Sequence, residues 1–166
     1  LICDHKNQNL WIYTADCMPI LFADKDKRRI AAIHCGRKGL EKNIISNAIK
    51  IFVNRGSSKS NILVAIGPSI SGDNYLLDKK TVLKCFSSFN RSLKEMNENI
   101  NILKNLNDCA SIPLDIKKHA YSELLMEGID PNNIDLSDKC TYALPHEFHS
   151  WRRSKNAKRQ WSVICS

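Results

Sequence analysis

Short apolar runs alternate with polar and charged segments along the first part of the chain. Three of these runs have the length of a β-strand, at residues 10–13, 20–23 and 29–33. Each is bounded by polar residues, as strands in globular proteins usually are. Their near-continuous hydrophobicity indicates strands that are buried on both faces.

The pattern then changes to helical spacing. Between residues 38 and 53 the apolar side chains recur three or four positions apart, at Leu40, Ile44, Ile45, Ala48, Ile49 and Phe52. This stripe predicts one amphipathic helix. The loop of residues 55–58, which contains Gly56, is expected to end it.

The rest of the chain mixes the two periods. Residues 61–66 predict a strand that Gly67 and Pro68 end, and residues 134–136 and 161–165 predict two short strands. Residues 79–89 and 115–126 predict helices, and the Asn-rich segment 90–107 is expected to be a flexible insertion. Because no strict βαβ rhythm is present, we expect one α+β (mixed α/β) domain over residues 1–166, with a buried mixed sheet flanked by helices.

Composition indicates a soluble globular protein of the cytoplasm. Hydrophobic residues make up 43% and charged residues 25% of the chain, which are ordinary values. No apolar run approaches the roughly 20 residues that cross a bilayer, and residues 4–6 interrupt any secretion signal. Seven cysteines, an odd number without CxxC spacing, favour free thiols in a reducing compartment.

The formal charge of +8 is compatible with an anionic partner. Basic clusters such as residues 25–29 contain no interleaved aromatic residues, so nucleic acid is disfavoured. A small anion such as phosphate fits the charge equally well, and a simple solubilising surface is the alternative. No coiled-coil seam predicts an oligomeric state.

A thiol and an imidazole stand at the ends of successive apolar runs. Residues 14–19 read Thr-Ala-Asp-Cys-Met-Pro, and residues 32–39 read Ala-Ile-His-Cys-Gly-Arg-Lys-Gly. If the two runs are neighbouring strands, Cys17 and His34 meet at one rim of the sheet. Cysteine and histidine are ligands that zinc favours. The alternative is a packed cysteine and a hydrogen-bonded structural histidine.

Three further side chains are candidates for the chemistry. Asp16 can orient a metal ligand or act as a general base, or it can cap a turn. Arg152 and Arg153 present guanidinium groups that suit an oxyanion, or they belong to a solvated basic loop. Cys35 is expected to point to the opposite face from His34 and is not a candidate ligand.

Common catalytic motifs are missing from the sequence. It contains no GxxxxGK[ST], no GxGxxG after a strand and no HExxH, which disfavours nucleotide-dependent phosphoryl transfer and hydride transfer. It also lacks the GxSxG motif of the common hydrolases.

Five blocks in one order carry a resemblance to a known family. Residues 14–21 resemble its TADC-P block, residues 32–39 its A-V-H-A-G-W-R-G block and residues 66–70 its I-G-P-C-I block. Residues 115–128 are similar to its D-L helix, and residues 140–153 match C-T-Y…F-x-S-x-R-R. From about Asp4 to Ile164 the chain therefore resembles the YfiH-like, or laccase-domain, purine nucleoside phosphorylases.

The resemblance implies a cytoplasmic zinc enzyme whose metal is held by two histidines and one cysteine. Its members cleave purine nucleosides with phosphate, and some also deaminate adenosine. Cys17 and His34 take two of the three ligand positions, and both are expected to be catalytic together with Asp16. The remaining histidine lies in a Q-V-H-like block that falls before Leu1, so we expect the family's N-terminal segment to be missing here.

The resemblance and the positive charge of the side chains indicate three residues for binding phosphate: Lys38, Arg152 and Arg153. The family's Trp-Arg pair is Arg37-Lys38 here, and its I-G-P-C cysteine is Ser69.

Two other functions remain open. Relatives have been described as peptidoglycan-editing amidases, and a non-catalytic protein that binds a nucleoside or a partner is also compatible with these substitutions. Copper oxidation is disfavoured, because one cysteine and one histidine do not provide the several histidine-rich sites that it requires.

Overall fold

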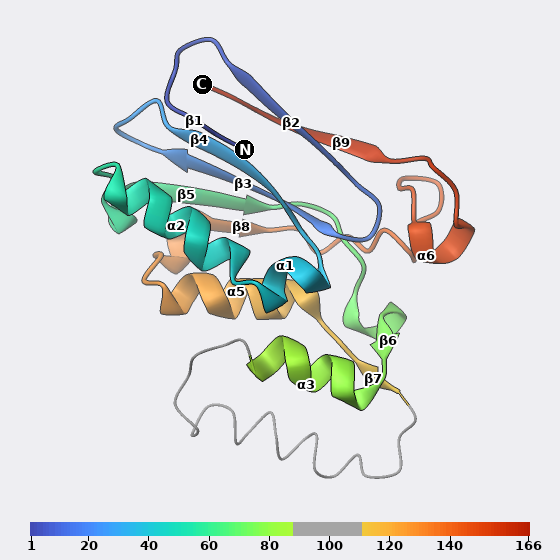
Figure 1. Ribbon diagram of the computed structural model, residues 1–166. Coiled ribbons are helices and arrows are strands. Elements are labelled where there is room, and N and C mark those ends of the chain that lie inside the picture. The colour runs from blue at the N-terminus through green and yellow to red at the C-terminus, as the bar shows by residue number, and fades with distance from the viewer. Residues whose placement is uncertain (88–110) are drawn as a thin grey trace.

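A five-stranded mixed sheet forms the centre of the protein (Figure 1). The computed structural model describes residues 1–87 and 111–166. The strand order is β1 (Ile2–Cys3), β4 (Ile30–Cys35), β3 (Met18–Asp24), β5 (Ile62–Ile66) and β8 (Ile134–Leu136). Only β5 and β8 are parallel among these neighbours. This sheet, with helices packed against it, confirms the predicted fold class.

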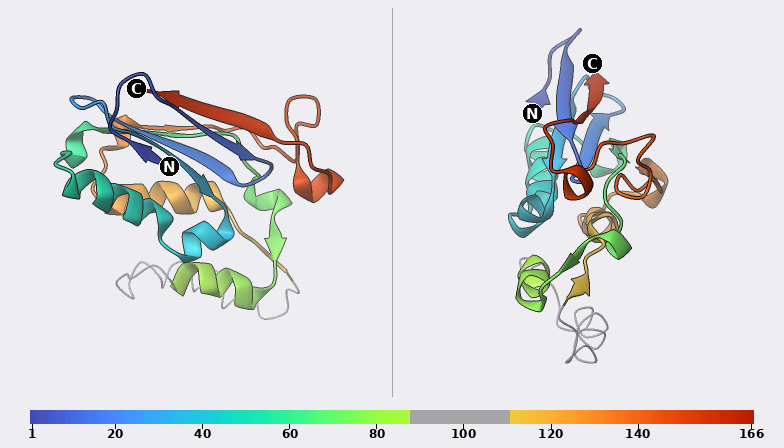
Figure 2. Two further views of the ribbon diagram at one scale, coloured as in Figure 1. Left: turned by 45° about the horizontal axis from the view of Figure 1, so that its top comes forward. Right: turned by 90° about the vertical axis from the view of Figure 1, so that its right-hand side faces the viewer.

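Three helices cover one face of the sheet: α1 (Arg37–Glu41), α2 (Ile44–Asn54) and α5 (Ile116–Met126) (Figures 1 and 2). Their apolar sides and one face of β3 and β4 form the core. The largest side chains buried there include Met18, Ile20, Phe22, Leu40, Ile45, Ile49, Phe52 and Ile116. The apolar stripe read from the sequence therefore faces the sheet, as predicted.

The stripe does not form one helix, however. Asn43 separates α1 from α2 with a left-handed backbone (φ 52°, ψ 43°). Asparagine tolerates this conformation better than most residues because its short side chain strains the backbone little. The single helix predicted for residues 38–53 is therefore wrong at this residue. The periodicity carried no signal for the break, since Leu40 and Ile44 stay on the buried side of both helices.

A two-stranded antiparallel ribbon lies over the other face of the sheet. It consists of β2 (Asn9–Thr14) and β9 (Gln160–Cys165) (Figure 2). Ile12 and Thr14 point inward and are buried, whereas Trp11 and Tyr13 point outward and are 54% and 52% exposed. The strand predicted at residues 10–13 is present, but burial on both of its faces is not.

Smaller elements complete the described structure. They are α3 (Lys79–Ser87), β6 (Leu76–Leu77), β7 (Ile112–Pro113), α6 (Trp151–Ser154) and the 3₁₀ turns η1 (Lys59–Asn61), η2 (Gly72–Asn74) and η3 (Pro131–Asn133). The helix predicted at residues 79–89 is observed as far as Ser87. The remainder of that prediction and the predicted insertion at 90–107 lie outside the described residues. Hydrophobic periodicity did not predict β1, β6, β7 or α6, which are only two to four residues long.

Truncating Phe52 tests this account of the core. Its ring is fully buried and lies 6.1 Å, centroid to centroid, from that of Phe22. Phe52→Ala is expected to lower the free energy of unfolding by about 3–5 kcal/mol, because the cavity adds to the lost transfer energy. Val53→Ala, on the exposed side of the same helix, should change it by only about 0.5 kcal/mol. Equal effects in denaturant titrations would contradict the packing.

Candidate active site

The pairing of β3 with β4 brings Cys17 and His34 together. Met18 is the register partner of Cys35, and Pro19 is that of His34. Cys17 directly precedes β3, so its side chain points to the same face as that of Pro19, which is the face that carries His34. The two positions are thus diagonal neighbours across two adjacent strands. Cys35 points into the core instead, as predicted.

Gly36 makes room for the sulfur of Cys17. A Cβ atom at position 36 would overlap Cys17 Sγ and would lie 3.4 Å from Cys17 Cβ. The space beside the backbone at the end of β4 is therefore occupied by the thiol. Glycine is required at this position by a neighbouring side chain and not by its own backbone angles, since Gly36 is extended.

The thiol of Cys17 is held in its protonated form when no ligand is bound. Burial raises its pKa above the ordinary value, and the negative charge of Asp16 raises it further. The positive charge of Arg159 acts in the opposite direction but is weaker. A cation bound at this position would favour the thiolate, which is the form that ligates metals.

Asp16 joins the turn before β3 to the C-terminal part of the chain. One carboxylate oxygen accepts a hydrogen bond from the Thr141 hydroxyl at 2.8 Å. The other accepts from the Ser150 hydroxyl at 3.0 Å and from the backbone amide of Arg152 at 2.7 Å. Asp16 is buried and has a positive φ of 86°. The carboxylate therefore ties the start of α6 to the turn before β3, through partners far away in the sequence and not through the amides of its own turn.

The two arginines of the C-terminal block have different environments. Arg153 donates from Nη1 to the carbonyls of Thr141 and Tyr142, at 2.8 and 2.7 Å, and from Nη2 to that of Phe148 at 2.7 Å. Its guanidinium thus organises the loop before α6. Arg152 donates to one carbonyl in the described part of the chain, that of Leu76, at 2.8 Å.

The first turn of α1 carries the other two cations near the end of β4. Lys38 is exposed. Arg37 donates to the carboxylate of Glu41, which also lies 3.8 Å from Lys84 Nζ. Arg37 is therefore partly neutralised, whereas Lys38 faces solvent.

Two residues that the sequence did not single out as site residues also belong to this region. Tyr75 lies close enough to Cys17 and Arg37 to be affected by both charges. Cys140 accepts hydrogen bonds from the amide and the hydroxyl of Ser71, at 3.3 and 3.2 Å, and from the Asn74 side chain at 3.5 Å. Cys140 thereby fixes the loop that leads to Tyr75. No local sequence signal reports this contact, because 69 residues separate Cys140 from Ser71.

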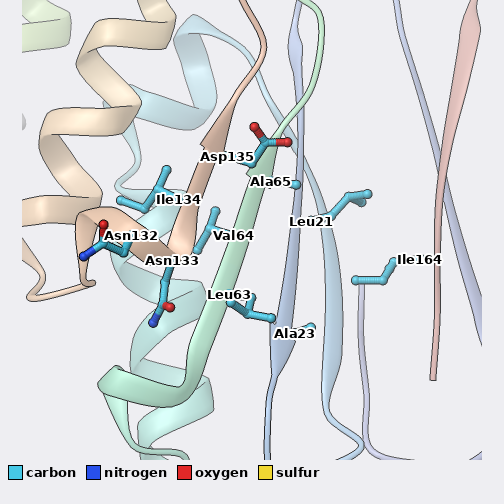
Figure 3. A pocket seen from close by; sticks show the side chains of 10 residues that line it. All are labelled: Leu21, Ala23, Leu63, Val64, Ala65, Asn132, Asn133, Ile134, Asp135 and Ile164. Carbon is cyan, nitrogen blue, oxygen red and sulfur yellow. The ribbon is translucent and has the colours of Figure 1, made fainter.

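A groove of about 410 Å³ opens on the same face of the sheet as Cys17 and His34, farther along the strands (Figure 3). Leu21, Leu63, Ala65 and Ile164 give it a largely apolar lining. Asp135 is its one titratable residue, and Cys17 and His34 do not contribute to it. We therefore place the candidate chemistry at the rim.

Cys17 and His34 have the chemistry of a zinc site, but they are two donors where zinc usually takes three or four from the protein. Within residues 1–87 and 111–166, no group of three or more His, Cys, Asp and Glu side chains is placed to hold a metal. The donors present thus fit part of a zinc site. None of the helices in the same two segments is long and apolar enough to cross a membrane.

Comparisons with known proteins agree with the fold and the blocks described above. Residues 1–166 match the family described as multi-copper polyphenol oxidoreductase laccase. A purine nucleoside phosphorylase of Synechocystis sp. is 30% identical over the whole chain and 67% of its own length. The purine nucleoside phosphorylase YlmD of Bacillus subtilis is 30% identical over 92% of the chain and 52% of its own length.

Solved structures show the same arrangement. The hypothetical protein YfiH of Bacillus licheniformis superimposes with a TM-score of 0.84 at 25% identity, covering 98% of this chain and 59% of its own. YlmD from Geobacillus stearothermophilus shares the fold, with a TM-score of 0.80, 22% identity and coverage of 99% and 59%.

The fold and the blocks define a YfiH-like α/β domain. The chain belongs to the laccase-like YfiH family, as the sequence blocks indicated. It spans between about half and two thirds of the length of the curated relatives compared above.

Removing the carboxylate of Asp16 is expected to loosen α6. Asp16→Ala leaves two hydroxyls and one amide without their acceptor, which should cost at least about 2 kcal/mol of stability. Hydrogen exchange at the Arg152 amide should accelerate more than exchange in β3. Asp135→Ala, at an exposed position of β8, is the control. Unchanged exchange at Arg152 would show that the carboxylate does not hold the helix.

Cys17 and Cys140 are expected to have thiol pKa values on opposite sides of the ordinary one. Burial raises the pKa of Cys17. At Cys140 burial also acts upward, but hydrogen bonds from Ser71 and from backbone amides outweigh it and lower the pKa. Alkylation of chelator-treated protein, followed by mass spectrometry across a pH series, should give a lower midpoint for Cys140 than for Cys17. The reverse order would refute these environments.

Proposed function

We propose that this protein is a zinc-dependent purine nucleoside phosphorylase that cleaves adenosine, inosine or guanosine with phosphate. The observation that carries the proposal is the β3–β4 register, which puts Cys17 and His34 on one face. The names of the curated relatives support the reaction class. The reducing cytoplasm is the proposed location, and a nucleoside and phosphate are the proposed ligands.

Cys17 and His34 are the proposed zinc ligands, and a histidine upstream of Leu1 is the proposed third one. The direction of β1 supports this. Leu1 donates its amino group to the Ala32 carbonyl at 3.0 Å, and β1 runs antiparallel to β4. A chain continued upstream in the same register would pass His34 two residues before Leu1. Zinc supplies Lewis-acid chemistry when it is bound.

Phosphate is proposed to bind between α6 and α1. Lys38 is exposed, and the guanidinium of Arg152 donates to one carbonyl in the described structure. Both side chains therefore retain N–H donors for an oxyanion. Arg153 is proposed to act indirectly, because three carbonyls already engage it. For the same reason Asp16 is proposed to position Arg152 and not to transfer a proton.

In the proposed reaction a phosphate oxygen forms a bond to the anomeric carbon of the ribose. The bond from that carbon to the purine nitrogen breaks, and the base leaves with the electron pair and takes up a proton. The products are the free base and ribose 1-phosphate. Holding phosphate and nucleoside in one orientation supplies much of the rate enhancement that a bimolecular displacement needs. Deamination of adenosine is a further proposed activity of the same site.

The test is incubation of zinc-loaded protein, expressed with whatever residues its gene encodes before Leu1, with inosine and phosphate. Hypoxanthine and ribose 1-phosphate are expected, and Cys17→Ala should lose both the activity and the stoichiometric zinc. Cys165→Ala removes an exposed thiol from β9 and should leave both unchanged.

Absence of product from folded, zinc-containing protein would refute the proposed reaction. Cleavage of a peptidoglycan precursor by the same preparation would favour the amidase instead. A protein that binds nucleosides without zinc or turnover would be a binding module. Adenosine in place of inosine tests the deaminase activity through the release of ammonia.

A further inference from the structure

Tyr75 stands between two arginines at the Cys17 end of the sheet. It follows η2 and is half-buried. The guanidinium carbon of Arg152 lies 5.3 Å from the centroid of its ring, within the range of a cation–π contact. The same guanidinium donates to the carbonyl of the next residue, Leu76. Tyr75 and its neighbour thus fix the direction of Arg152.

The positive charge of Arg37 acts on the same tyrosine. Burial raises the pKa of Tyr75, while the charge of Arg37 and a side-chain hydrogen bond from it act in the opposite direction. The charge of Cys17 also raises this pKa, which places the hydroxyl within electrostatic range of the thiol. One phenol thus lies against the guanidinium of Arg152 and within range of the charges of Arg37 and Cys17.

Arg152, unlike Arg37, has no carboxylate partner among the described residues. Arg37 is paired with Glu41, but among residues 1–87 and 111–166 no carboxylate lies within ion-pair distance of Arg152. The carboxylate of Asp16 accepts from the Arg152 backbone amide and from two hydroxyls. A guanidinium held in a fixed direction with free donors is suited to an oxyanion.

We propose that Tyr75 is a positioning residue that directs Arg152 and Arg37 toward one anion, the phosphate co-substrate, next to Cys17. This inference rests on the proposed phosphorolysis and adds two residues to its phosphate site. Arg37 occupies the position of a tryptophan in the family block that this segment resembles. The second guanidinium is therefore a feature of this chain.

The contributions of ring and hydroxyl are separable. The face of the ring supports the guanidinium of Arg152, whereas the hydroxyl interacts with the charge of Arg37. Tyr75→Phe therefore removes only the interaction with Arg37, and Tyr75→Leu removes both interactions. When an interaction with Tyr75 is lost, the arginine side chain becomes more mobile, and phosphate binding must then order it at a cost in conformational entropy. Weaker phosphate binding is the consequence, with little effect on the nucleoside.

Two measurements test the proposal on the same protein preparations. Calorimetric titration with inorganic phosphate is expected to give a dissociation constant about tenfold higher for Tyr75→Leu and about threefold higher for Tyr75→Phe, as expected for the partial loss of charge-assisted hydrogen bonds. In steady-state kinetics the KM for phosphate should rise similarly, while the KM for inosine stays within about twofold. Tyr13→Leu, on the outer face of β2, is the matched control and should change neither.

Several outcomes would overturn the proposal. They are an unchanged phosphate affinity in Tyr75→Leu, an equal rise of both KM values, or no phosphate binding by the wild type. If Tyr75→Leu does not fold, as judged by circular dichroism, Tyr75→Phe and Arg152→Gln decide the matter, and unchanged phosphate affinity in both refutes it. If wild-type protein binds phosphate, and loses affinity in Tyr75→Leu, without any turnover of inosine, the proposed reaction fails. The role of Tyr75 in positioning an anion site then stands, but phosphate as a co-substrate does not.

Discussion

The site depends on a single buried carboxylate. Asp16 accepts hydrogen bonds from Thr141, Ser150 and Arg152, which are 125 to 136 residues away in the sequence. Hydrogen bonds to a buried charged group are among the stronger ones in proteins, and an unpaired carboxylate there would be costly. Because Cys17 is the next residue, the same contacts that dock α6 also fix where the thiol lies. The geometry of the rim and the path of the C-terminal segment are therefore set together.

The positive backbone angle of Asp16 belongs to the same constraint. A φ of 86° is uncommon for a residue with a side chain, and such conformations persist only where surrounding contacts enforce them. Here the carboxylate has three donors, and the Asp16 carbonyl accepts from the Ile70 amide at 2.9 Å. Four hydrogen bonds thus hold a tight turn between the ribbon and the sheet.

Hydrophobic periodicity predicted the strands and helices that build the core, because apolar side chains facing the helices must recur with the period of their element. It did not predict the break at Asn43, which depends on one backbone conformation, or the short elements β1, β6, β7 and α6, which have too few residues to show a period. The pairing of the strands that follow Cys17 and carry His34 could be anticipated from the two successive apolar runs. The partners of Asp16, Arg153 and Tyr75 could not, since each comes from a distant part of the chain.

The close contact between Gly36 and Cys17 restricts which residues can occupy these two positions. The sulfur of Cys17 occupies the space that a Cβ atom at position 36 would need. A methyl group gained on one strand would require atoms to be lost from the other. Position 36 is therefore restricted to glycine for as long as a cysteine occupies position 17, whereas a smaller residue at position 17 would leave space for a side chain at position 36.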